Sequence, residues 1–392
     1  MRIASIVSIP VRLPRDLSRA RGTAGSPTTL AGEGSYRWST AYPVLYSTEF
    51  ETALVRVELE NGLVGWGEAQ APLAPEVACT IVDLLLRPAL VGEDFDGTPD
   101  RITTLWERMY ATMRVRGQTG GFMLDAMSGI DIALWDLAGK LANKPVCDLL
   151  AASPKRTIPA YLSGTSGANP AERAAFAARY ADEGFSLVKL YYESDWRELL
   201  AVADSLPAGM RFAVDALWHL PPAAAVGMAR ELDSRNARWL ECPLYPEDVA
   251  GHARLAAASS TPLAIGESYR TVHELEPFRG VAGVLQPDLG RCGITGALGI
   301  ARAFGTPIVP HLSIAMGPQI AAALHFAAAV DACSLCEFNP NVLDTANQFL
   351  AEPLVQQGGR YHTPALPGLG IVWNSRFVAE IAAPVGGRAA ST

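Results

Sequence analysis

The sequence lacks the features that mark membrane, nucleic-acid-binding and disulfide-rich secreted proteins. No apolar segment reaches the roughly 18–20 residues that a membrane-spanning helix needs. No run of Lys or Arg exceeds two residues and the net charge is −8, so we expect neither nucleic acid nor an anionic membrane surface as a partner. The six cysteines are scattered through 392 residues without the dense spacing of a disulfide framework. Together with the absence of a signal-peptide pattern, this predicts a cytoplasmic protein.

The first part of the chain, residues 1–125, shows mixed strand and helix patterns. Residues Ile3–Leu13 and Glu51–Glu60 alternate like strands, and Asn61-Gly62 is a hairpin signal that leads into a third strand. Helical periodicity follows over Pro75–Leu90 and Thr103–Tyr110. We predict a separate α+β domain here, because 392 residues exceed the ~250 of a single barrel.

A long segment between the first two predicted strands, residues 18–47, is rich in Gly, Ser, Thr and Pro. It also carries several Arg, Trp and Tyr side chains. Loops of this length inside a compact domain are typically lids or binding loops. We therefore predict a lid, with an ordered surface excursion that binds nothing as the alternative.

Four polar residues in the second part of the chain recur at intervals of 26 residues: Lys189, Asp215, Glu241 and Glu267. Each ends a short apolar run, and stretches of helical period separate the runs. A repeat of strand, polar tip and helix predicts a (β/α) barrel, whose chemistry lies at the C-terminal ends of its strands.

Eight strands complete the predicted barrel, which we assign to residues 126–363. The strands are Thr157–Leu162, Ser186–Leu190, Arg211–Val214, Arg238–Leu240, Pro262–Gly266, Val284–Gln286, Pro307–Pro310 and Ser334–Cys336. A strongly amphipathic helix, Ala126–Lys140, precedes them. Residues 364–392 leave the barrel pattern, and we expect them to return to the N-terminal domain with a disordered tail.

Asp215, Glu241 and Glu267 offer three hard oxygen ligands from neighbouring strand ends. Three carboxylates so close together need a cation to coexist, and the absence of His and Cys from the set favours Mg²⁺ over zinc. The alternative is that each acid pairs with a nearby Arg or Lys at the barrel rim.

His311 and Asp288 follow two adjacent strands, the seventh and the sixth. A carboxylate beside an imidazole fixes its tautomer and raises its basicity, which suits a general base. Glu337 follows the eighth strand; it is either a rim acid or, if desolvated, a protonated hydrogen-bond donor to an oxyanion.

This layout resembles the enolase superfamily, in its mandelate racemase/muconate lactonizing branch and its mandelate racemase-like subgroup. The resemblance rests on the Ala126–Lys140 helix, the three acids, the run Gln286–Gly293, Val309-Pro-His311 and Glu337. It implies a (β/α)7β barrel capped by an α+β domain built from both termini. It also implies Mg²⁺ on the three acids, His311 with Asp288 as base, and Lys189 with Glu337 stabilising charge on the substrate carboxylate. The partner is then a small-molecule carboxylate, and the family suggests a dimer or octamer.

Two positions depart from the subgroup pattern. The second strand usually ends in Lys-x-Lys, but here it reads Lys189-Leu-Tyr191, so Tyr191 stands where a second base is usual. Tyr191 is therefore either an acid/base with a lowered pKa or only a substrate contact. Leu217 replaces an Asn that often follows the first metal ligand.

A single dependable base favours β-elimination, because racemisation needs an acid/base on each face of the carbanion. We therefore predict Mg²⁺-dependent abstraction of a carboxylate α-proton, with dehydration of an aldonate or aldarate to a 2-keto-3-deoxy acid as the first hypothesis. A racemase, an epimerase or a sugar-acid lactone cycloisomerase of the same family is the alternative. A non-catalytic metal-binding protein is the alternative of another class.

Overall fold

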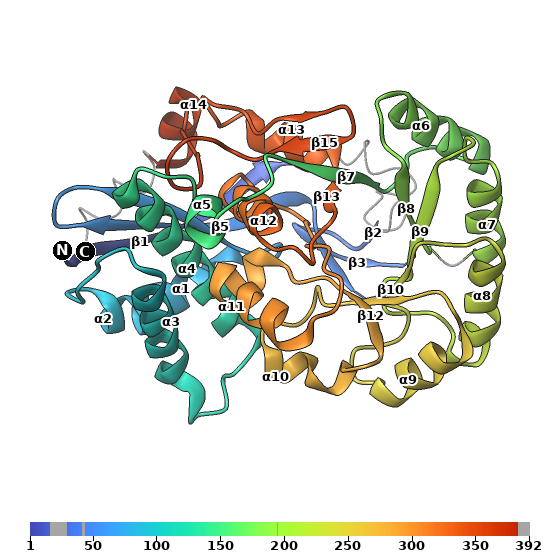
Figure 1. Cartoon of the computed structure of the whole chain (residues 1–392), viewed down its shortest axis with the longest axis horizontal. Coiled ribbons are helices and arrows are strands. Elements are labelled where there is room, and N and C mark those ends of the chain that lie inside the picture. Colours follow the sequence, from blue (N-terminus) through green and yellow to red (C-terminus); the bar gives the residue numbers. More distant parts are fainter. Residues whose placement is uncertain (16–29, 41–43, 194, 383–392) are drawn as a thin grey trace.

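The computed structural model describes residues 1–15, 30–40, 44–193 and 195–382. Figure 1 shows an N-terminal sheet and helices on one side and a barrel with its surrounding helices on the other. Among the described residues, no helix is both long and apolar enough to cross a membrane. Residues 18–29 and 41–43 of the predicted lid, and the predicted disordered tail 384–392, lie outside these residues.

The N-terminal sheet has three antiparallel strands in the order β1 (Ile3–Pro14), β5 (Glu49–Leu59) and β6 (Val64–Ala69). The predicted hairpin is confirmed: Glu58 pairs with Val64, and Gly62 takes a φ of 82° that favours glycine. Alternate strand residues are buried against helices, so this sheet has one packed face and supports a core of its own.

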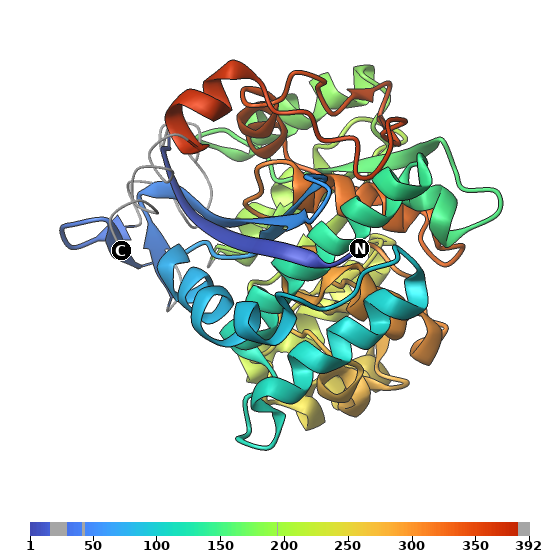
Figure 2. The same cartoon turned by 90° about the vertical axis from the view of Figure 1, so that its left-hand side faces the viewer.

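Helices cover this sheet as the periodicity predicts. The helical segment 75–90 is α1 (Pro75–Ile81), a π-helical turn (Val82–Leu86) and α2 (Arg87–Leu90), followed by α3 (Pro99–Arg114). The predicted amphipathic helix is α4 (Gly121–Ala142), which is buried on nearly every face because it lies between the cap sheet and the barrel. In Figure 2 the cap helices stand in front of the barrel.

The predicted lid is not purely a loop. Its described part contains a small antiparallel sheet of β2 (Leu30–Ala31), β3 (Tyr36–Ser39) and β4 (Leu45–Ser47). Strands of two to four residues are too short to show a clear alternation in sequence, which is why the prediction missed them.

The barrel confirms the predicted fold class. Its parallel strands are β7 (Thr157–Ser163), β8 (Leu187–Tyr191), β9 (Arg211–Asp215), β10 (Leu240–Glu241), β11 (Leu263–Ile265), β12 (Ala282–Leu285) and β13 (Cys336–Phe338). Neighbouring strands pair in chain order, and β13 pairs with β7. The connecting helices are α6 (Pro170–Asp182), α7 (Trp196–Asp204), α8 (Pro222–Ser234), α9 (Val249–Ala258), α10 (Val272–Leu275), α11 (Leu289–Phe304) and α12 (Pro318–Ala329).

Two predicted strands need correction. The seventh, Pro307–Pro310, forms only single bridges, in which Ile308 pairs with Leu285 and Cys333. Both prolines lack the N–H that a ladder requires, so a regular strand cannot form there. The eighth lies two residues later than predicted, which places Glu337 within the strand rather than beyond its end.

The C-terminal segment runs back along the barrel and reaches the cap. After α13 (Pro340–Asn347), β14 (Gln356–Gln357) and β15 (Arg360–His362) form a hairpin against β7. A last helical turn, α14 (Ser375–Phe377), and the π-helical residues Val378–Ala382 pack against β1 and β5 (Figure 2). The rings of Trp373 and Phe377 stack at 3.9 Å, and both meet Trp66 of the cap edge-on.

Candidate active site

The interior of the barrel consists of an apolar layer with a polar layer above it. Side chains on a strand alternate with a period of two, so residues two apart on one strand point into the barrel at successive levels. The apolar layer is Tyr161, Leu187, Ala213, Trp239, Ala264, Val284, Val309 and Leu335. Two residues further along, the side chains of the polar layer are Ser163, Lys189, Asp215, Glu241, Gln286, His311 and Glu337.

The three predicted metal ligands come together. Asp215, Glu241 and Glu267 each offer a carboxylate oxygen, and these oxygens lie within 4.8 Å of one another. Burial and the Glu241 charge raise the pKa of Asp215 well above its ordinary value, although Lys189 opposes this. Such crowding of buried acids favours the binding of a cation.

Lys189 lies among the acids rather than at their edge. Its Nζ is 2.6 Å from Glu241, 2.9 Å from Glu337 and 3.4 Å from Asp215. Burial disfavours its charge, but Glu241 and Glu337 outweigh burial and raise its pKa well above the ordinary value. Lys189 is therefore a permanently charged ammonium that holds the acids together.

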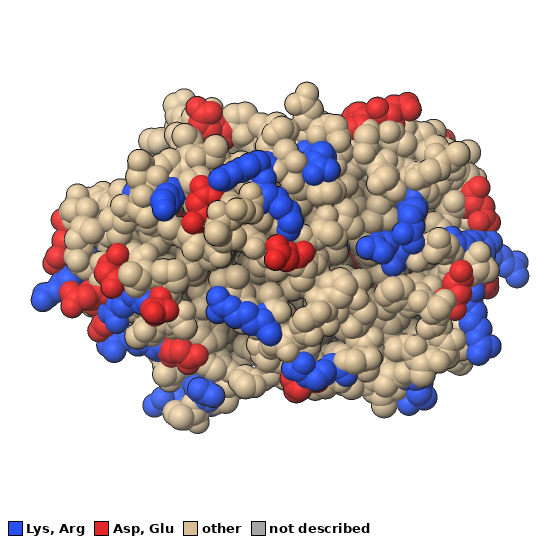
Figure 3. All heavy atoms as spheres, in the orientation of Figure 1, with Lys and Arg blue, Asp and Glu red and all other residues tan. Residues whose placement is uncertain are grey.

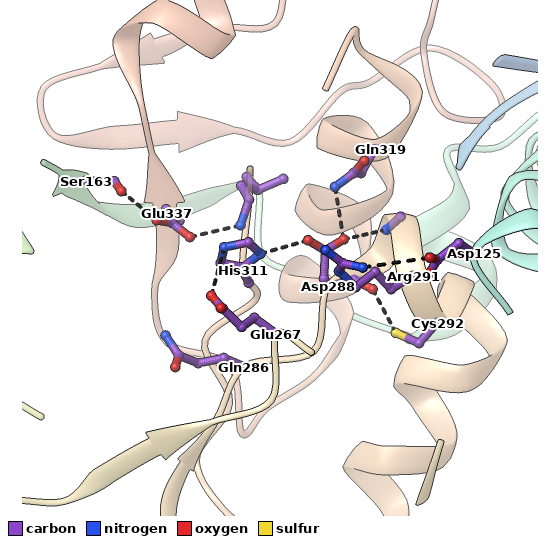
Figure 4. A network of polar contacts seen from close by, with 12 residues as sticks. Asp125, Ser163, Glu267, Gln286, Asp288, Arg291, Cys292, His311, Gln319 and Glu337 are labelled. Atoms are coloured by element: carbon purple, nitrogen blue, oxygen red, sulfur yellow. Dashed lines mark hydrogen bonds and ion pairs between the residues drawn. The ribbon is translucent and has the colours of Figure 1, made fainter. Parts of the chain in front are cut away.

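His311 and Asp288 form a dyad (Figure 4). The imidazole Nδ1 lies 2.7 Å from Asp288 Oδ2 and donates to it, which leaves Nε2 to exchange protons. Nε2 in turn lies 3.2 Å from Glu267. Burial disfavours the charged imidazole, but Glu267 and Asp288 together raise the pKa of His311 to about 10.

The surroundings of Glu337 favour its ionised form over the hypothesised protonated donor. Burial alone would favour the neutral acid. The Lys189 ammonium, His311, the Leu312 N–H and the Ser163 hydroxyl outweigh burial and lower its pKa to about 2. Glu337 therefore accepts hydrogen bonds from Ser163 and Leu312 in this structure.

Tyr191 faces the same interior, but its pKa moves away from that of a base. Burial raises the pKa well above the ordinary value, and the nearby Lys189 does not compensate. Its hydroxyl meets Ser163 Oγ at 2.9 Å, and Ser163 donates to Glu337. Tyr191 is thus a neutral phenol at the end of a hydrogen-bonded chain.

Sequence reasoning missed the N–H donors that hold the acids. Trp218 Nε1 donates to Glu267 at 2.9 Å, Trp239 Nε1 donates to Glu241 at 3.0 Å, and the Leu217 N–H donates to Asp215 at 2.9 Å. Leu217 and Trp218 both have left-handed backbones, with φ of 51° and 63°. Such strain is uncommon for large side chains and clusters at functional sites. No spacing signal marks the donation by Leu217 and Trp218, because their orientation depends on the loop backbone.

The donor set fits a hard divalent cation. All three candidate ligands are carboxylates, and each accepts a hydrogen bond from an N–H group. Lys189 is a single positive charge beside several negative charges, so the site still favours a cation. Oxygen donors of this kind suit Mg²⁺, Ca²⁺ or Mn²⁺ rather than zinc. The fold and this site together define a barrel protein whose acidic set at the strand ends can hold a metal.

Comparison with known proteins narrows this class to a family. Residues 172–377 match the family described as enolase C-terminal domain-like, and residues 38–151 match the mandelate racemase/muconate lactonizing enzyme N-terminal domain. The chain belongs to the enolase superfamily and is mandelate racemase-like, which confirms the resemblance seen in the sequence.

Relatives of known activity cover most of the chain. D-galactarolactone cycloisomerase from Agrobacterium fabrum is 32% identical, over 84% of this chain and 91% of its own length. D-galactonate dehydratase from Klebsiella pneumoniae strain 342 is 31% identical, over 69% and 74%. The structure of an enolase superfamily member from Agrobacterium tumefaciens superposes with a TM-score of 0.89 at 28% identity, covering 97% of this chain and 98% of that one.

Proposed function

We propose that this protein is a Mg²⁺-dependent acid-sugar dehydratase that converts an aldonate or aldarate to a 2-keto-3-deoxy acid. The observation that carries the proposal is the asymmetry of the site. A cation bound to Glu267 would offset the charge that contributes most to raising the pKa of His311, which would free a neutral Nε2 to accept a proton with Asp288 behind it. Tyr191, by contrast, is a neutral phenol held by Ser163. One base suffices for elimination of water but not for racemisation, which needs a second.

The proposed reaction consists, up to the enol, of two proton transfers, both by His311, and the cleavage of one C–O bond. His311 Nε2 takes the α-proton, and the electrons of the C–H bond move into the carboxylate to give an enediolate. The β C–O bond then breaks as the electrons return, and His311 gives its proton to the departing hydroxide, which leaves as water. The resulting enol tautomerises to the 2-keto acid.

Lys189 places its ammonium beside the region where the substrate carboxylate gains charge. Bound Mg²⁺ on Asp215, Glu241 and Glu267 would supply further positive charge that binds the carboxylate and favours loss of the α-proton. Glu337 and Ser163 keep Lys189 and Tyr191 in place through their hydrogen bonds. We further expect the chain to work in the cytoplasm as a dimer or octamer, which sedimentation would test.

A D-galactarolactone cycloisomerase-like reaction is the second candidate, because that relative matches 84% of the chain. Both reactions share the first proton transfer and differ in which oxygen leaves. A cycloisomerase retains the formula of its substrate, whereas a dehydratase releases water.

A panel of aldonates, aldarates and their lactones, incubated with protein and Mg²⁺, tests the proposal by mass spectrometry. A product lighter by one water that reacts as a 2-keto acid supports the dehydratase. An isomer of unchanged mass from a lactone supports the second candidate. No product from any acid sugar, with Mg²⁺ still bound, supports the non-catalytic alternative.

A further inference from the structure

A buried carboxylate of the cap, Glu68, binds the start of helix α12 and is not used by the proposed mechanism. It lies on β6 and is fully buried. It accepts hydrogen bonds from the Met316 N–H at 2.6 Å, the Gln319 N–H at 3.1 Å and the Thr52 hydroxyl at 2.9 Å. These contacts join the cap to the segment between His311 and α12.

Glu68 lies at the N-terminus of helix α12, where backbone N–H groups need acceptors. Helix α12 begins at Pro318 after Gly317, which has no side chain to cap the free N–H groups of the first turn. A carboxylate near a helix N-terminus satisfies those groups and interacts favourably with the helix dipole. Glu68 therefore caps α12 from another domain.

The cap also binds the barrel domain at a second position, next to the His311–Asp288 dyad. The N–H of Gln70, just after β6, donates to the Gly290 carbonyl at 2.7 Å. The Gly290 N–H in turn donates to Asp288 Oδ1 at 2.8 Å. The cap thus fixes the backbone that supplies one hydrogen bond to Asp288.

Gln319 supplies the other hydrogen bond to the same oxygen. Its Nε2 lies 3.0 Å from Asp288 Oδ1, and Figure 4 shows the amide and His311 on different oxygens of Asp288. Only the amide nitrogen can donate to a carboxylate, so the orientation of the amide is determined. A side chain at position 290 would collide with the Gln319 amide, which leaves glycine as the residue that allows this approach.

We propose that Gln319 and Glu68 are positioning residues for the base: the cap fixes Asp288, and through it His311. Both donors to Asp288 Oδ1 belong to residues that β6 holds, Gly290 through Gln70 and Gln319 through Glu68. With Oδ1 fixed, Oδ2 can receive only the Nδ1–H of a correctly oriented imidazole. The proposal rests on the proposed function in taking His311 as the base.

The test compares Gln319→Met, which keeps the volume but loses the donor, with Glu68→Gln and with Thr295→Val as a matched control. Thr295 lies on α11 and donates to the buried Asp131 of α4, so its removal breaks a similar buried contact that does not reach Asp288. The first readout is the Nδ1 proton resonance of His311 in ¹⁵N-histidine-labelled protein with Mg²⁺, assigned by its loss in His311→Asn. The second is kcat and KM for the acid sugar that the wild type turns over best.

We expect Gln319→Met to shift or broaden this resonance and to lower kcat roughly 10- to 100-fold, with KM changed by less than about threefold. Glu68→Gln should act in the same direction with a smaller effect, and Thr295→Val should lower thermal stability while leaving the resonance in place. If Gln319→Met does not fold, Gln319→Leu also removes the donor with an uncharged side chain of similar size.

An unchanged resonance and kcat in Gln319→Met, or an equal change in Thr295→Val, overturns the proposal. An effect of Gln319→Met without any effect of Glu68→Gln overturns the part assigned to the cap. If the wild type turns over no acid sugar, the proposed function fails, and the resonance alone still decides whether Gln319 positions the dyad.

Discussion

The two layers inside the barrel are built on the same strands and yet behave in opposite ways. The lower layer is filled by side chains such as Tyr161 and Trp239, whose rings meet edge-on at 5.3 Å. The upper layer, two residues further along each strand, brings an ammonium, an imidazole and several carboxylates together. On the outer face drawn in Figure 3, by contrast, acidic and basic side chains are interspersed.

The difference shows how a barrel can carry a charged site in its interior. The lower layer closes the barrel to water, so charges above it interact more strongly than they would in solvent. The upper layer is stable only because each charge has a partner: Lys189 faces three acids, and His311 lies between Glu267 and Asp288. Changes in the two layers should therefore have different consequences.

Replacing Lys189 with Met should have the largest effect on stability. It leaves Asp215, Glu241 and Glu337 buried without their shared ammonium, and breaking a buried ion pair from one side costs about 3–5 kcal/mol. Mg²⁺ should restore much of this loss by supplying positive charge to the same acids. Urea unfolding with Mg²⁺ and with EDTA measures both effects.

Leu187→Ala is the matched change in the lower layer, on the same strand. It should cost about 2–5 kcal/mol through the cavity that it leaves. Mg²⁺ should raise its stability no more than that of the wild type. An equal Mg²⁺ rescue of both variants would show that the two layers do not differ as described.

The indole N–H groups that donate to Glu267 and Glu241 should affect how tightly the site binds Mg²⁺. Trp218→Phe keeps an aromatic ring but removes the N–H that donates to Glu267 Oε1, so Mg²⁺ binding should weaken roughly 10-fold or more. Trp239→Phe should matter less, because Gln286 still donates to the same oxygen of Glu241 at 2.7 Å. Calorimetric titration with Mg²⁺ decides between them, and a larger loss in Trp239→Phe would contradict this order.

His311 in the polar layer and His325 on α12 are both largely buried, but their surroundings shift their pKa values in opposite directions. Acids raise the pKa of His311, whereas burial lowers the pKa of His325 on α12 to about 4. A hydrogen bond to the Leu369 backbone and the charge of Asp148 oppose this lowering only in part, and Arg156 adds to it. His325 is therefore neutral in the fold, and its Nδ1 accepts the Cys147 N–H. The stability that this neutral form contributes is present above the ordinary pKa of about 6.5 and is lost as the pH falls towards 4.

Between pH 7.5 and pH 5 this histidine should account for a loss of about 2 kcal/mol in the free energy of unfolding. His325→Asn offers an uncharged acceptor to Cys147 and should show a smaller loss over the same range. Unfolding curves of both proteins at the two pH values provide the measurement. Parallel losses would contradict the assignment.

The smallest effect is expected from Tyr191→Phe. The change removes one hydrogen bond to Ser163 and leaves the dyad intact, so turnover should fall by less than about 10-fold. A collapse of turnover comparable with that of His311→Asn would make Tyr191 a second acid/base and favour an epimerase.

Much of this molecule could be predicted from the sequence because strand ends determine which residues meet. The 26-residue interval placed Lys189 and the three acids on adjacent strands; the structure brings the three acids together and pairs Lys189 with Asp215 and Glu241. The protonation state of Glu337 could not be predicted in this way, since it depends on Lys189, Leu312 and Ser163 arriving together.

Other features depend on backbone detail that residue patterns do not show. The irregular seventh strand was foreseeable in principle from Pro307 and Pro310. The indole of Trp218 reaches Glu267 only because two residues adopt left-handed conformations. The contacts of Glu68 join segments about 250 residues apart, as its 251-residue separation from Gln319 shows, and no local signal marks such a pair.

The most direct test of the account is exchange of substrate α-protons in D₂O with Mg²⁺, followed by NMR for wild type and His311→Asn on a panel of acid sugars. We predict that wild type exchanges the α-proton and forms a 2-keto acid from at least one of them. His311→Asn should lose roughly 10²- to 10⁴-fold of both activities, the contribution typical of a general base. Exchange that persists undiminished in His311→Asn would contradict the assignment of His311 as the base.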